Sequence, residues 1–184
     1  MKQSAAYPLV ALVSLILAPF VYAQEQGPAQ AEYELLAAIA GEYTYEYTEV
    51  GQPTQTGEIV FELIPGGRFL RFEEDATSPD GSPMRIMGFI GYDSVHRYFT
   101  WYRVFDNGAY DQARGTLEDG TLTFDMTESH TEPFGDSNWA GPGVRLRTKW
   151  TGFSEGGLTR FSWERSVNGG PWERLSEGRN TRVR

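Results

Sequence analysis

The sequence predicts an all-β protein: a single antiparallel up-and-down β-barrel of about 8–10 strands, preceded by one short N-terminal helix. Three observations predict this fold. Apolar and polar residues alternate with a period of two along most of the chain. The alternating segments are separated by tight-turn sequences such as Asp-Gly and Asn-Gly. Helical periodicity is convincing in one segment, near the N-terminus. A meander of this kind closes on itself because closure removes the exposed edge strands.

Residues 1–23 have the features of a secretory signal peptide. Lys2 is the only charged residue among them, Pro8–Ala18 form an apolar run, and Val21-Tyr22-Ala23 ends in a small residue at the cleavage position. A membrane anchor is the alternative, but the apolar run is too short to span a bilayer and Pro19 follows it. We therefore expect export to the periplasm or the extracellular space, with no membrane-spanning segment in the mature chain.

The mature chain is expected to form one domain. Residues 24–30 are polar and contain Gly27 and Pro28, which is typical of a disordered lead. Residues 31–184 then form the barrel domain. Ala31–Ala40 predict the helix, because they are good helix formers with one apolar face and Gly41 follows them.

Strand patterns follow the helix almost without interruption. The centre of the chain, Arg85–Met126, holds four aromatic-rich segments separated by the turn sequences DSVHR, DNG and EDG. The loop over residues 128–143 is the longest irregular piece. The remaining expected strands are Glu42–Thr48, Gly57–Ile64, Arg68–Asp75, Val144–Thr151, Leu158–Val167 and Trp172–Arg179.

Composition excludes several classes of function. The chain has no cysteine, which rules out a thiol nucleophile, a cysteine-ligated zinc and a lipid-modified cysteine at the export site. Its formal net charge of -9 disfavours binding to nucleic acid and to anionic lipid surfaces. The chain contains no G-x-S-x-G elbow, no H-E-x-x-H motif, no P-loop and no G-x-G-x-x-G after a strand.

A series of short motifs resembles a known family. They are Leu36–Gly41, the Gly-Gly-Arg-Phe-Leu step within Pro65–Leu70, Gly91-Tyr92-Asp93, Gly-Thr-Leu-Glu-Asp-Gly-Thr-Leu-Thr, and Ser-Val-Asn-Gly-Gly-Pro-Trp. Together they are similar to the bacterial proteins grouped as domain of unknown function 1579, which have a lipocalin-like (calycin) barrel. Such proteins often have a tryptophan in the first strand, where this chain has Tyr43. The resemblance implies the fold, a small-molecule cavity and no established reaction.

Aromatic residues on the apolar strand faces are the main candidates for binding a ligand. They can line a cavity that buries apolar surface, or they can fill the barrel completely. The candidates are Phe61, Phe72, Trp101, Trp150 and Trp163.

Two arginines share the faces of these aromatic residues. Arg103 has the same strand parity as Trp101, and Arg165 has the same parity as Trp163. An inward guanidinium can hold a ligand carboxylate through two hydrogen bonds. The alternative is an arginine near a strand end that pairs with one of the many acidic residues.

The remaining polar residues indicate structural roles. Asp93 is expected to cap the turn after Tyr92 through backbone hydrogen bonds. His96 and His130 are the only histidines. His130 lies among acidic residues that can bind a divalent metal, and either histidine can hold haem, but a solvated histidine is the favoured interpretation of both. We therefore predict no cofactor, with haem as a minor alternative.

The sequence is compatible with three functions. The favoured one is an exported monomer that binds a small hydrophobic or amphipathic molecule inside the barrel. The second is an enzyme on the same barrel, of the isomerase or cyclase type, with positioned Tyr, Asp and Arg groups. The third is an envelope interaction module with a solid core that acts through the loop containing Phe134 and Trp139.

Overall fold

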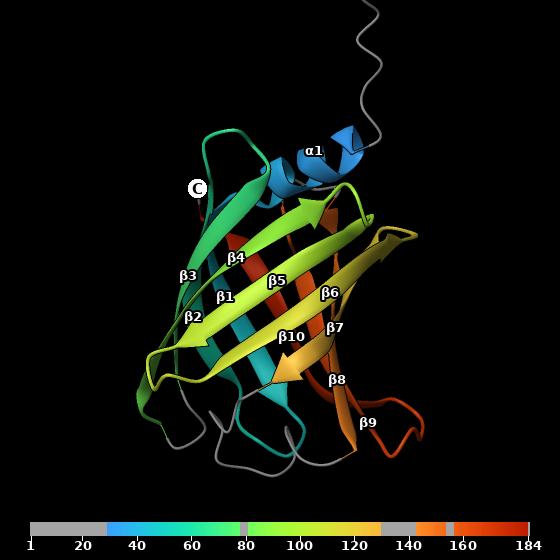
Figure 1. The fold of residues 1–184 in the computed structure, drawn as a ribbon. Coiled ribbons are helices and arrows are strands. Elements are labelled where there is room, and N and C mark those ends of the chain that lie inside the picture. Colours follow the sequence, from blue (N-terminus) through green and yellow to red (C-terminus); the bar gives the residue numbers. More distant parts are fainter. Residues whose placement is uncertain (1–28, 78–80, 130–142, 154–156, 184) are drawn as a thin grey trace, which may run out of the picture.

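The fold is a closed barrel of ten strands with a helix at one end (Figure 1). A computed structural model describes residues 29–77, 81–129, 143–153 and 157–183. The elements are α1 (Gln30–Ile39), β1 (Gly41–Glu49), β2 (Gln55–Leu63), β3 (Phe69–Thr77), β4 (Pro83–Asp93), β5 (Tyr98–Phe105), β6 (Tyr110–Glu118), β7 (Thr121–Ser129), β8 (Val144–Thr151), β9 (Arg160–Val167) and β10 (Glu173–Arg182).

Every strand pairs with its neighbour in sequence, and the last strand returns to the first. β1 and β10 are antiparallel, with Tyr45 opposite Asn180 and Tyr43 opposite Arg182. This pairing closes the sheet, so none of the described strands is left as an edge. The predicted all-β, up-and-down antiparallel barrel with one N-terminal helix is confirmed.

The β6–β7 hairpin shows how local sequence specifies the meander. Glu118 and Thr121 are paired, which leaves a two-residue loop of Asp119 and Gly120. Both loop residues have positive φ, 49° and 73°. Asp-Gly is favoured at such a turn because glycine has no Cβ to oppose this conformation and aspartate tolerates it.

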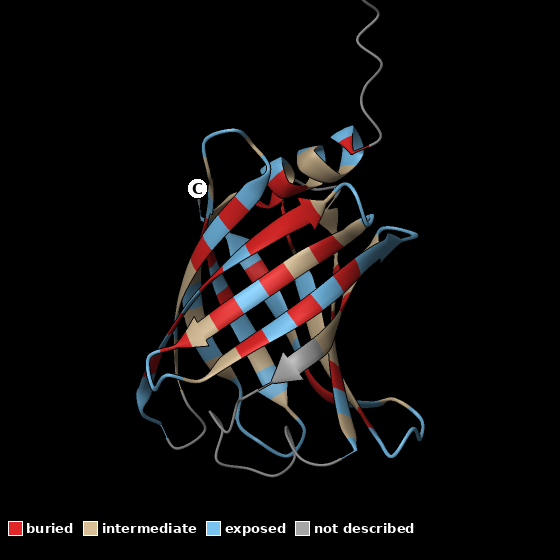
Figure 2. Cartoon of the chain, viewed as in Figure 1, coloured by how far each residue is buried: buried red, intermediate tan, exposed pale blue. Residues whose placement is uncertain are grey.

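Burial alternates along the strands, as the period of two predicts (Figure 2). In β4, Met84, Ile86 and Ile90 are buried, whereas Met87 and Phe89 are on the outer face. The inner faces of neighbouring strands bring large apolar side chains together in one core. Its most completely buried large members are Phe72, Phe99, Phe124, Leu36, Ile39, Leu70, Ile90 and Leu122.

Helix α1 covers one end of the barrel and contacts β2, β3 and β4. It begins and ends one residue earlier than predicted. Two of its own side chains, Leu36 and Ile39, are 0% exposed and form part of the core. The Tyr43 hydroxyl donates a hydrogen bond of 2.8 Å to the Ile39 carbonyl, and the Arg182 guanidinium donates to the Ala40 carbonyl. Among the described residues, no helix is long and apolar enough to cross a membrane.

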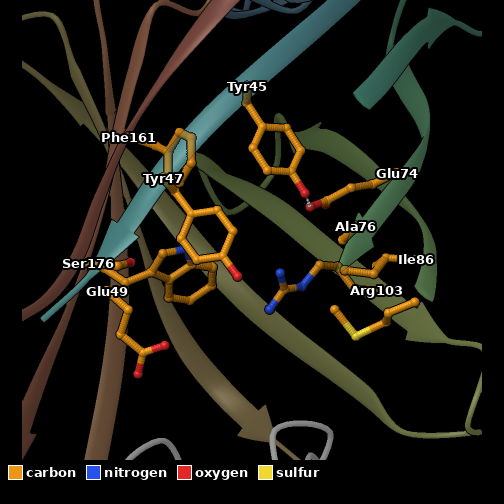
Figure 3. A pocket seen from close by; sticks show the side chains of 11 residues that line it. Tyr45, Tyr47, Glu49, Glu74, Ala76, Ile86, Arg103, Phe161 and Ser176 are labelled. Carbon is orange, nitrogen blue, oxygen red and sulfur yellow. Dashed lines mark hydrogen bonds between the residues drawn. The ribbon is translucent and has the colours of Figure 1, made fainter. Parts of the chain in front are cut away.

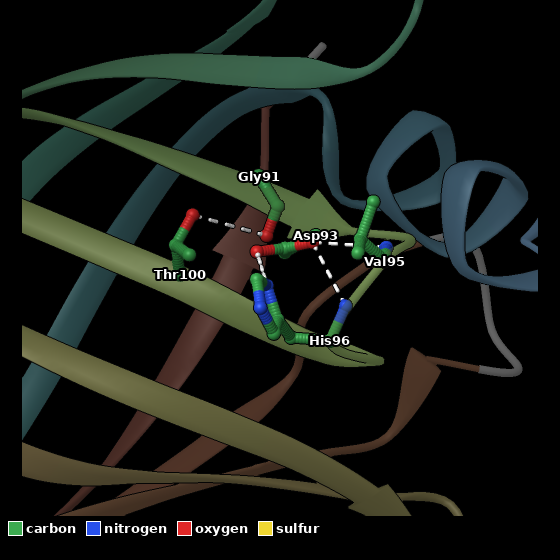
Figure 4. Close-up of polar contacts among 5 residues, drawn as sticks. All are labelled: Gly91, Asp93, Val95, His96 and Thr100. Carbon is green, nitrogen blue, oxygen red and sulfur yellow. Dashed lines mark hydrogen bonds and ion pairs between the residues drawn. The ribbon is translucent and has the colours of Figure 1, made fainter.

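The Gly-Tyr-Asp motif at the end of β4 supports the same end of the barrel. Asp93 accepts hydrogen bonds from the backbone N–H groups of Val95 and His96 at 2.9 and 3.0 Å, and its carboxylate also contacts the His96 ring (Figure 4). These bonds lower the pKa of Asp93. Tyr92 packs against Tyr33 of α1, with ring centroids 6.1 Å apart. The predicted turn-capping role of Asp93 is confirmed.

The contact between α1 and the barrel can be tested with Leu36→Ala. Removing this completely buried side chain is expected to lower the free energy of unfolding by roughly 2–5 kcal/mol, because apolar burial is lost and a cavity remains. Urea unfolding measures this change. The exposed Glu34→Ala serves as the control within the same helix and should change stability by less than about 0.5 kcal/mol. Equal effects of the two substitutions would show that α1 does not stabilise the barrel.

Candidate ligand-binding site in the barrel interior

The interior is not completely filled by side chains. Two adjacent compartments, each with a volume of about 70 Å³, lie inside the barrel. They share part of their walls, formed by Tyr45, Glu74, Arg103, Phe161 and Trp163.

The two compartments lie at different heights along the barrel. The distal compartment is lined by Glu49, Ala76 and Met84, which lie near the strand ends opposite α1. The helix-proximal compartment lies nearer to α1 and has Leu158 and Asn180 in its wall. The other residues that line only one of them are Tyr47, Ile86 and Ser176 in the distal compartment, and Ile59, Phe61, Phe72, Trp101 and Trp150 in the helix-proximal compartment.

Two glycines explain why large aromatic side chains leave space near the axis. A Cβ at Gly57 would lie 2.3 Å from Cζ of Tyr45, and a Cβ at Gly178 would lie 2.2 Å from Cζ of Phe161. Each ring therefore lies directly against the backbone of a neighbouring strand. This close approach holds both rings near the wall, and the wall of both compartments is consequently aromatic.

Arg103 is the charged centre of the interior and is 8% exposed. Its Nε lies 3.0 Å from each carboxylate oxygen of Asp111, and its Nη2 also donates to Asp111. The guanidinium carbon lies 4.7 Å from the ring centroid of Trp101 and 5.0 Å from that of Trp163. Asp111 therefore neutralises Arg103, and the aromatic rings hold the guanidinium in place.

Glu74 is a second interior carboxyl group and accepts a hydrogen bond of 2.8 Å from the Tyr45 hydroxyl (Figure 3). The compartments leave part of the Glu74 surface accessible, but the barrel wall surrounds the carboxyl group. Burial raises the pKa of Glu74, and the opposing effects of Arg103 and of the Tyr45 hydrogen bond do not cancel this shift. Burial also raises the pKa of Tyr45, and it raises the pKa of Tyr47 to about 12. Both phenols are therefore neutral at physiological pH.

Several buried polar atoms have no hydrogen-bond partner within the part of the chain that the structure describes. Trp101 Nε1 and Asn180 Nδ2 belong to residues of the helix-proximal compartment, and the Ser176 hydroxyl belongs to the distal one. Thr148 Oγ1 is a fourth such atom. Buried polar atoms without partners are rare in folded proteins, so this group of atoms is a feature that a ligand can explain.

The structure brings together six of the seven residues expected to bind a ligand. Phe61, Phe72, Trp101, Arg103, Trp150 and Trp163 all line the compartments. Their rings contact one another directly: Trp101 and Trp150 have centroids 5.2 Å apart, and Phe61 and Trp150 have centroids 6.0 Å apart. These aromatic residues form a shared wall and do not fill the barrel completely.

Arg165 is the seventh of the residues expected to bind a ligand. It is not among the residues that line either compartment, although it has the strand parity of Trp163. Its guanidinium lies 3.4 Å from the Glu173 carboxylate, and its side chain is 26% exposed. Glu173 lies directly opposite Arg165 in the register of β9 with β10, so Arg165 pairs with it at a partly exposed position. This is the alternative that the sequence left open for it.

Sequence reasoning did not select Tyr45, Glu74, Asp111 or Asn180. A signal for Glu74 existed, because it follows Leu70 and Phe72 at the same strand parity, and both are buried. However, Glu74 lies between Glu73 and Asp75, and a run of three acidic residues does not have the apolar pattern that indicates an inward face. Asp111 shares its face with Ala113 and Gly115, so no apolar stripe marked that face as inward.

The described residues place no histidine where it can hold a haem group inside the barrel. His96 lies in the turn after β4, where its side chain is 67% exposed and contacts Asp93. His130 lies outside the described residues. No histidine among the described residues lines either compartment, and these residues contain no group of three or more His, Cys, Asp or Glu placed to hold a metal.

The fold and the site together define a closed antiparallel β-barrel with a partly hollow, aromatic interior. The chain belongs to the DUF1579 family of proteins of unknown function, whose family model matches residues 28–178. A comparison with curated proteins finds no match.

A comparison with solved structures finds similar chains. The crystal structure of Rv2717c from M. tuberculosis has a TM-score of 0.53 and 15% identity, covering 82% of this chain and 96% of that chain. A de novo designed fluorescence-activating β-barrel has a TM-score of 0.40 and 11% identity, covering 80% and 95%. A redesigned β-barrel has a TM-score of 0.42 and 15% identity, covering 82% and 96%. At 15% identity, the likeness to the M. tuberculosis protein concerns the fold alone.

The raised pKa of Glu74 predicts a pH dependence of stability. Above the ordinary glutamate pKa of 4.5, the folded protein retains a proton that the unfolded chain has lost. The free energy of unfolding must therefore fall as the pH rises from that value to the raised pKa, by about 1.4 kcal/mol for each pH unit in this interval.

Glu74→Gln removes this fall in the free energy of unfolding. The free energy of unfolding of the variant minus that of the wild type should therefore increase from pH 4 to pH 8. Urea unfolding across this range measures the difference. Glu58→Gln is the matched control, because Glu58 lies exposed on the outer face of β2. Parallel stability curves for wild type and Glu74→Gln would rule out a raised pKa at this residue.

Proposed function

We propose that this protein binds a small, mainly apolar ligand inside the barrel. The observation that carries the proposal is the pair of unfilled compartments with aromatic walls and unpaired polar atoms. On the same scale of cavity volume, one water molecule occupies about 10–15 Å³. Each compartment, with about 70 Å³, therefore has space for several non-hydrogen atoms. Burying apolar ligand surface against these rings favours binding by a free energy of roughly 25 cal/mol per Å² of buried surface.

The size of the compartments limits the ligand. Typical pockets for drug-sized molecules have volumes of roughly 300–1,000 Å³, well above the 70 Å³ of either compartment. A slender molecule that extends through both compartments fits this space better than a broad, rigid ring system. A short alkyl chain with one polar group is therefore the preferred class.

Export to the periplasm or the extracellular space belongs to the same proposal. Its support is the signal-like sequence of residues 1–23, which lie outside the described residues. We also propose that the ligand-binding form is a monomer, because the barrel encloses both compartments without a second chain.

Octan-1-ol is expected to raise the unfolding temperature of the wild-type protein. A ligand at 100 times its dissociation constant stabilises the folded state by about 2.7 kcal/mol, which corresponds to roughly 5–10 °C for a domain of this size. Differential scanning calorimetry measures the shift. Ala76→Phe places a large ring in the wall of the distal compartment and should abolish most of it.

Ala31→Phe adds the same ring at an exposed position of α1 and should leave the shift unchanged. If both variants respond like the wild type, the alcohol acts elsewhere on the protein and the interior site is excluded.

Proton transfer within the same cavity is a second candidate function. Glu74 and Tyr45 are two hydrogen-bonded groups with raised pKa values, and both face the compartments. A carboxylate with a raised pKa is a stronger base than a solvated one. Glu74 can therefore remove a proton from the carbon next to a ligand carbonyl group, which leaves an enolate and a neutral carboxyl group.

Hydrogen exchange in D₂O tests this second candidate. The protein should accelerate the incorporation of deuterium next to the carbonyl group of octan-2-one, and Glu74→Gln should abolish the acceleration. Mass spectrometry measures the incorporation. Glu58→Gln serves as the control again, and an identical rate with wild type and Glu74→Gln would exclude Glu74 as the base.

The two compartments support an interior ligand over the interaction-module alternative. It required a barrel packed solid with side chains, whereas two compartments are present. Phe134 and Trp139, the residues expected to bind a partner, lie outside the described residues.

A further inference from the structure

The unpaired polar groups of the helix-proximal compartment are hydrogen-bond donors. Trp101 is 6% exposed and Asn180 is 7% exposed, and both residues line this compartment. Trp101 Nε1 and Asn180 Nδ2 have no hydrogen-bond partner in the described part of the chain. An indole nitrogen can only donate, and an amide nitrogen likewise donates.

Leaving such donors unpaired is unfavourable for the folded protein. A buried polar group without a partner is more destabilising than the same group in contact with water or an acceptor. A ligand atom that accepts hydrogen bonds removes this disadvantage when it binds. A ligand that is entirely apolar leaves the disadvantage in place, so the compartment selects for an acceptor.

The interior charges determine what kind of acceptor fits. Arg103 is already neutralised by Asp111 through several hydrogen bonds. Glu74 provides a second carboxyl group in the same wall. A ligand carboxylate would be a third acid beside a single guanidinium, and burying a charge without a counter-charge is strongly unfavourable.

A ligand amine does not suit the compartment either. Its positive charge would lie beside Arg103, which lines both compartments. An ammonium group has no lone pair and cannot accept a hydrogen bond from Trp101 or Asn180. Glu74 can attract such a group, but the donors would remain unpaired.

We propose that the polar group of the ligand is an uncharged hydrogen-bond acceptor, such as the carbonyl oxygen of a ketone, aldehyde, ester or amide, and that Trp101 and Asn180 bind it. This inference rests on the ligand-binding function proposed above and specifies its ligand class. It replaces the expectation that Arg103 or Arg165 binds a ligand carboxylate. The apolar part of the ligand then extends along the aromatic wall.

A matched set of eight-carbon ligands tests the proposal at pH 7. The probes are octan-2-one, octanoate and octylamine, which share a similar apolar chain and differ in the polar group. Quenching of the intrinsic tryptophan fluorescence and isothermal titration calorimetry measure the affinities. The ketone should bind at least about 10-fold more tightly than either charged ligand, a difference of about 1.4 kcal/mol.

Two substitutions test the named donors. Asn180→Leu and Trp101→Phe each remove an N–H group while retaining much of the side-chain volume, and each should weaken binding of the ketone by about 5-fold to 10-fold. Gln52→Leu is the matched control at an exposed loop position and should leave the affinity unchanged. Asn180→Leu should also fold at least as stably as wild type, because it removes an unpaired buried donor.

The outcomes separate the inference from the proposed function. Tight binding of octanoate or octylamine would overturn the uncharged-acceptor inference and leave an interior ligand site standing. Unchanged ketone affinity in both Asn180→Leu and Trp101→Phe would also overturn the inference. Failure of all three probes to bind the wild-type protein would overturn both the inference and the proposed function.

Discussion

The antiparallel pairing of β1 with β10 is the constraint on which the other contacts of the barrel rely. The chain contains no cysteine, so burial and backbone hydrogen bonds hold the domain together. The pairing of Tyr43 with Arg182 and Tyr45 with Asn180 joins the two ends of a ten-strand meander. It gives the sheet an inside, and the interior contacts exist because the sheet is closed.

Closure also encloses polar residues of several strands in one interior. Glu74 on β3 and Tyr45 on β1 are separated by 29 positions and form a hydrogen bond. Arg103 on β5 and Asp111 on β6 form a buried ion pair between neighbouring strands. These four residues bring charge and hydrogen-bonding groups into an interior whose wall is otherwise rich in aromatic side chains.

The aromatic residues have two roles at once. Trp101, Trp150 and Phe124 contact one another with centroid distances of 5.0–5.3 Å and stabilise the core by burial. Tyr45 and Phe161 instead lie against glycines of adjacent strands and form the wall of the compartments. The same class of side chain therefore fills one part of the barrel and leaves space in another.

The amino-acid sequence alone was enough to establish the fold class, the order of the elements and most of the aromatic wall. This was possible because strand parity and turn chemistry are local: alternation placed Trp101, Arg103 and Phe105 on one inward face, and Asp-Gly specified a tight hairpin. The three-dimensional arrangement, in contrast, settled which charged residues enter the interior and which pair with one another. Arg103 and Arg165 have equivalent local patterns, yet the first is buried against Asp111 while the second pairs with Glu173 near a strand end. They differ because strand parity gives the side of the sheet but not how closely the surrounding strands enclose a side chain: the side chains of Arg103 and Asp111 are 10% and 4% exposed, whereas those of Arg165 and Glu173 are 26% and 60% exposed.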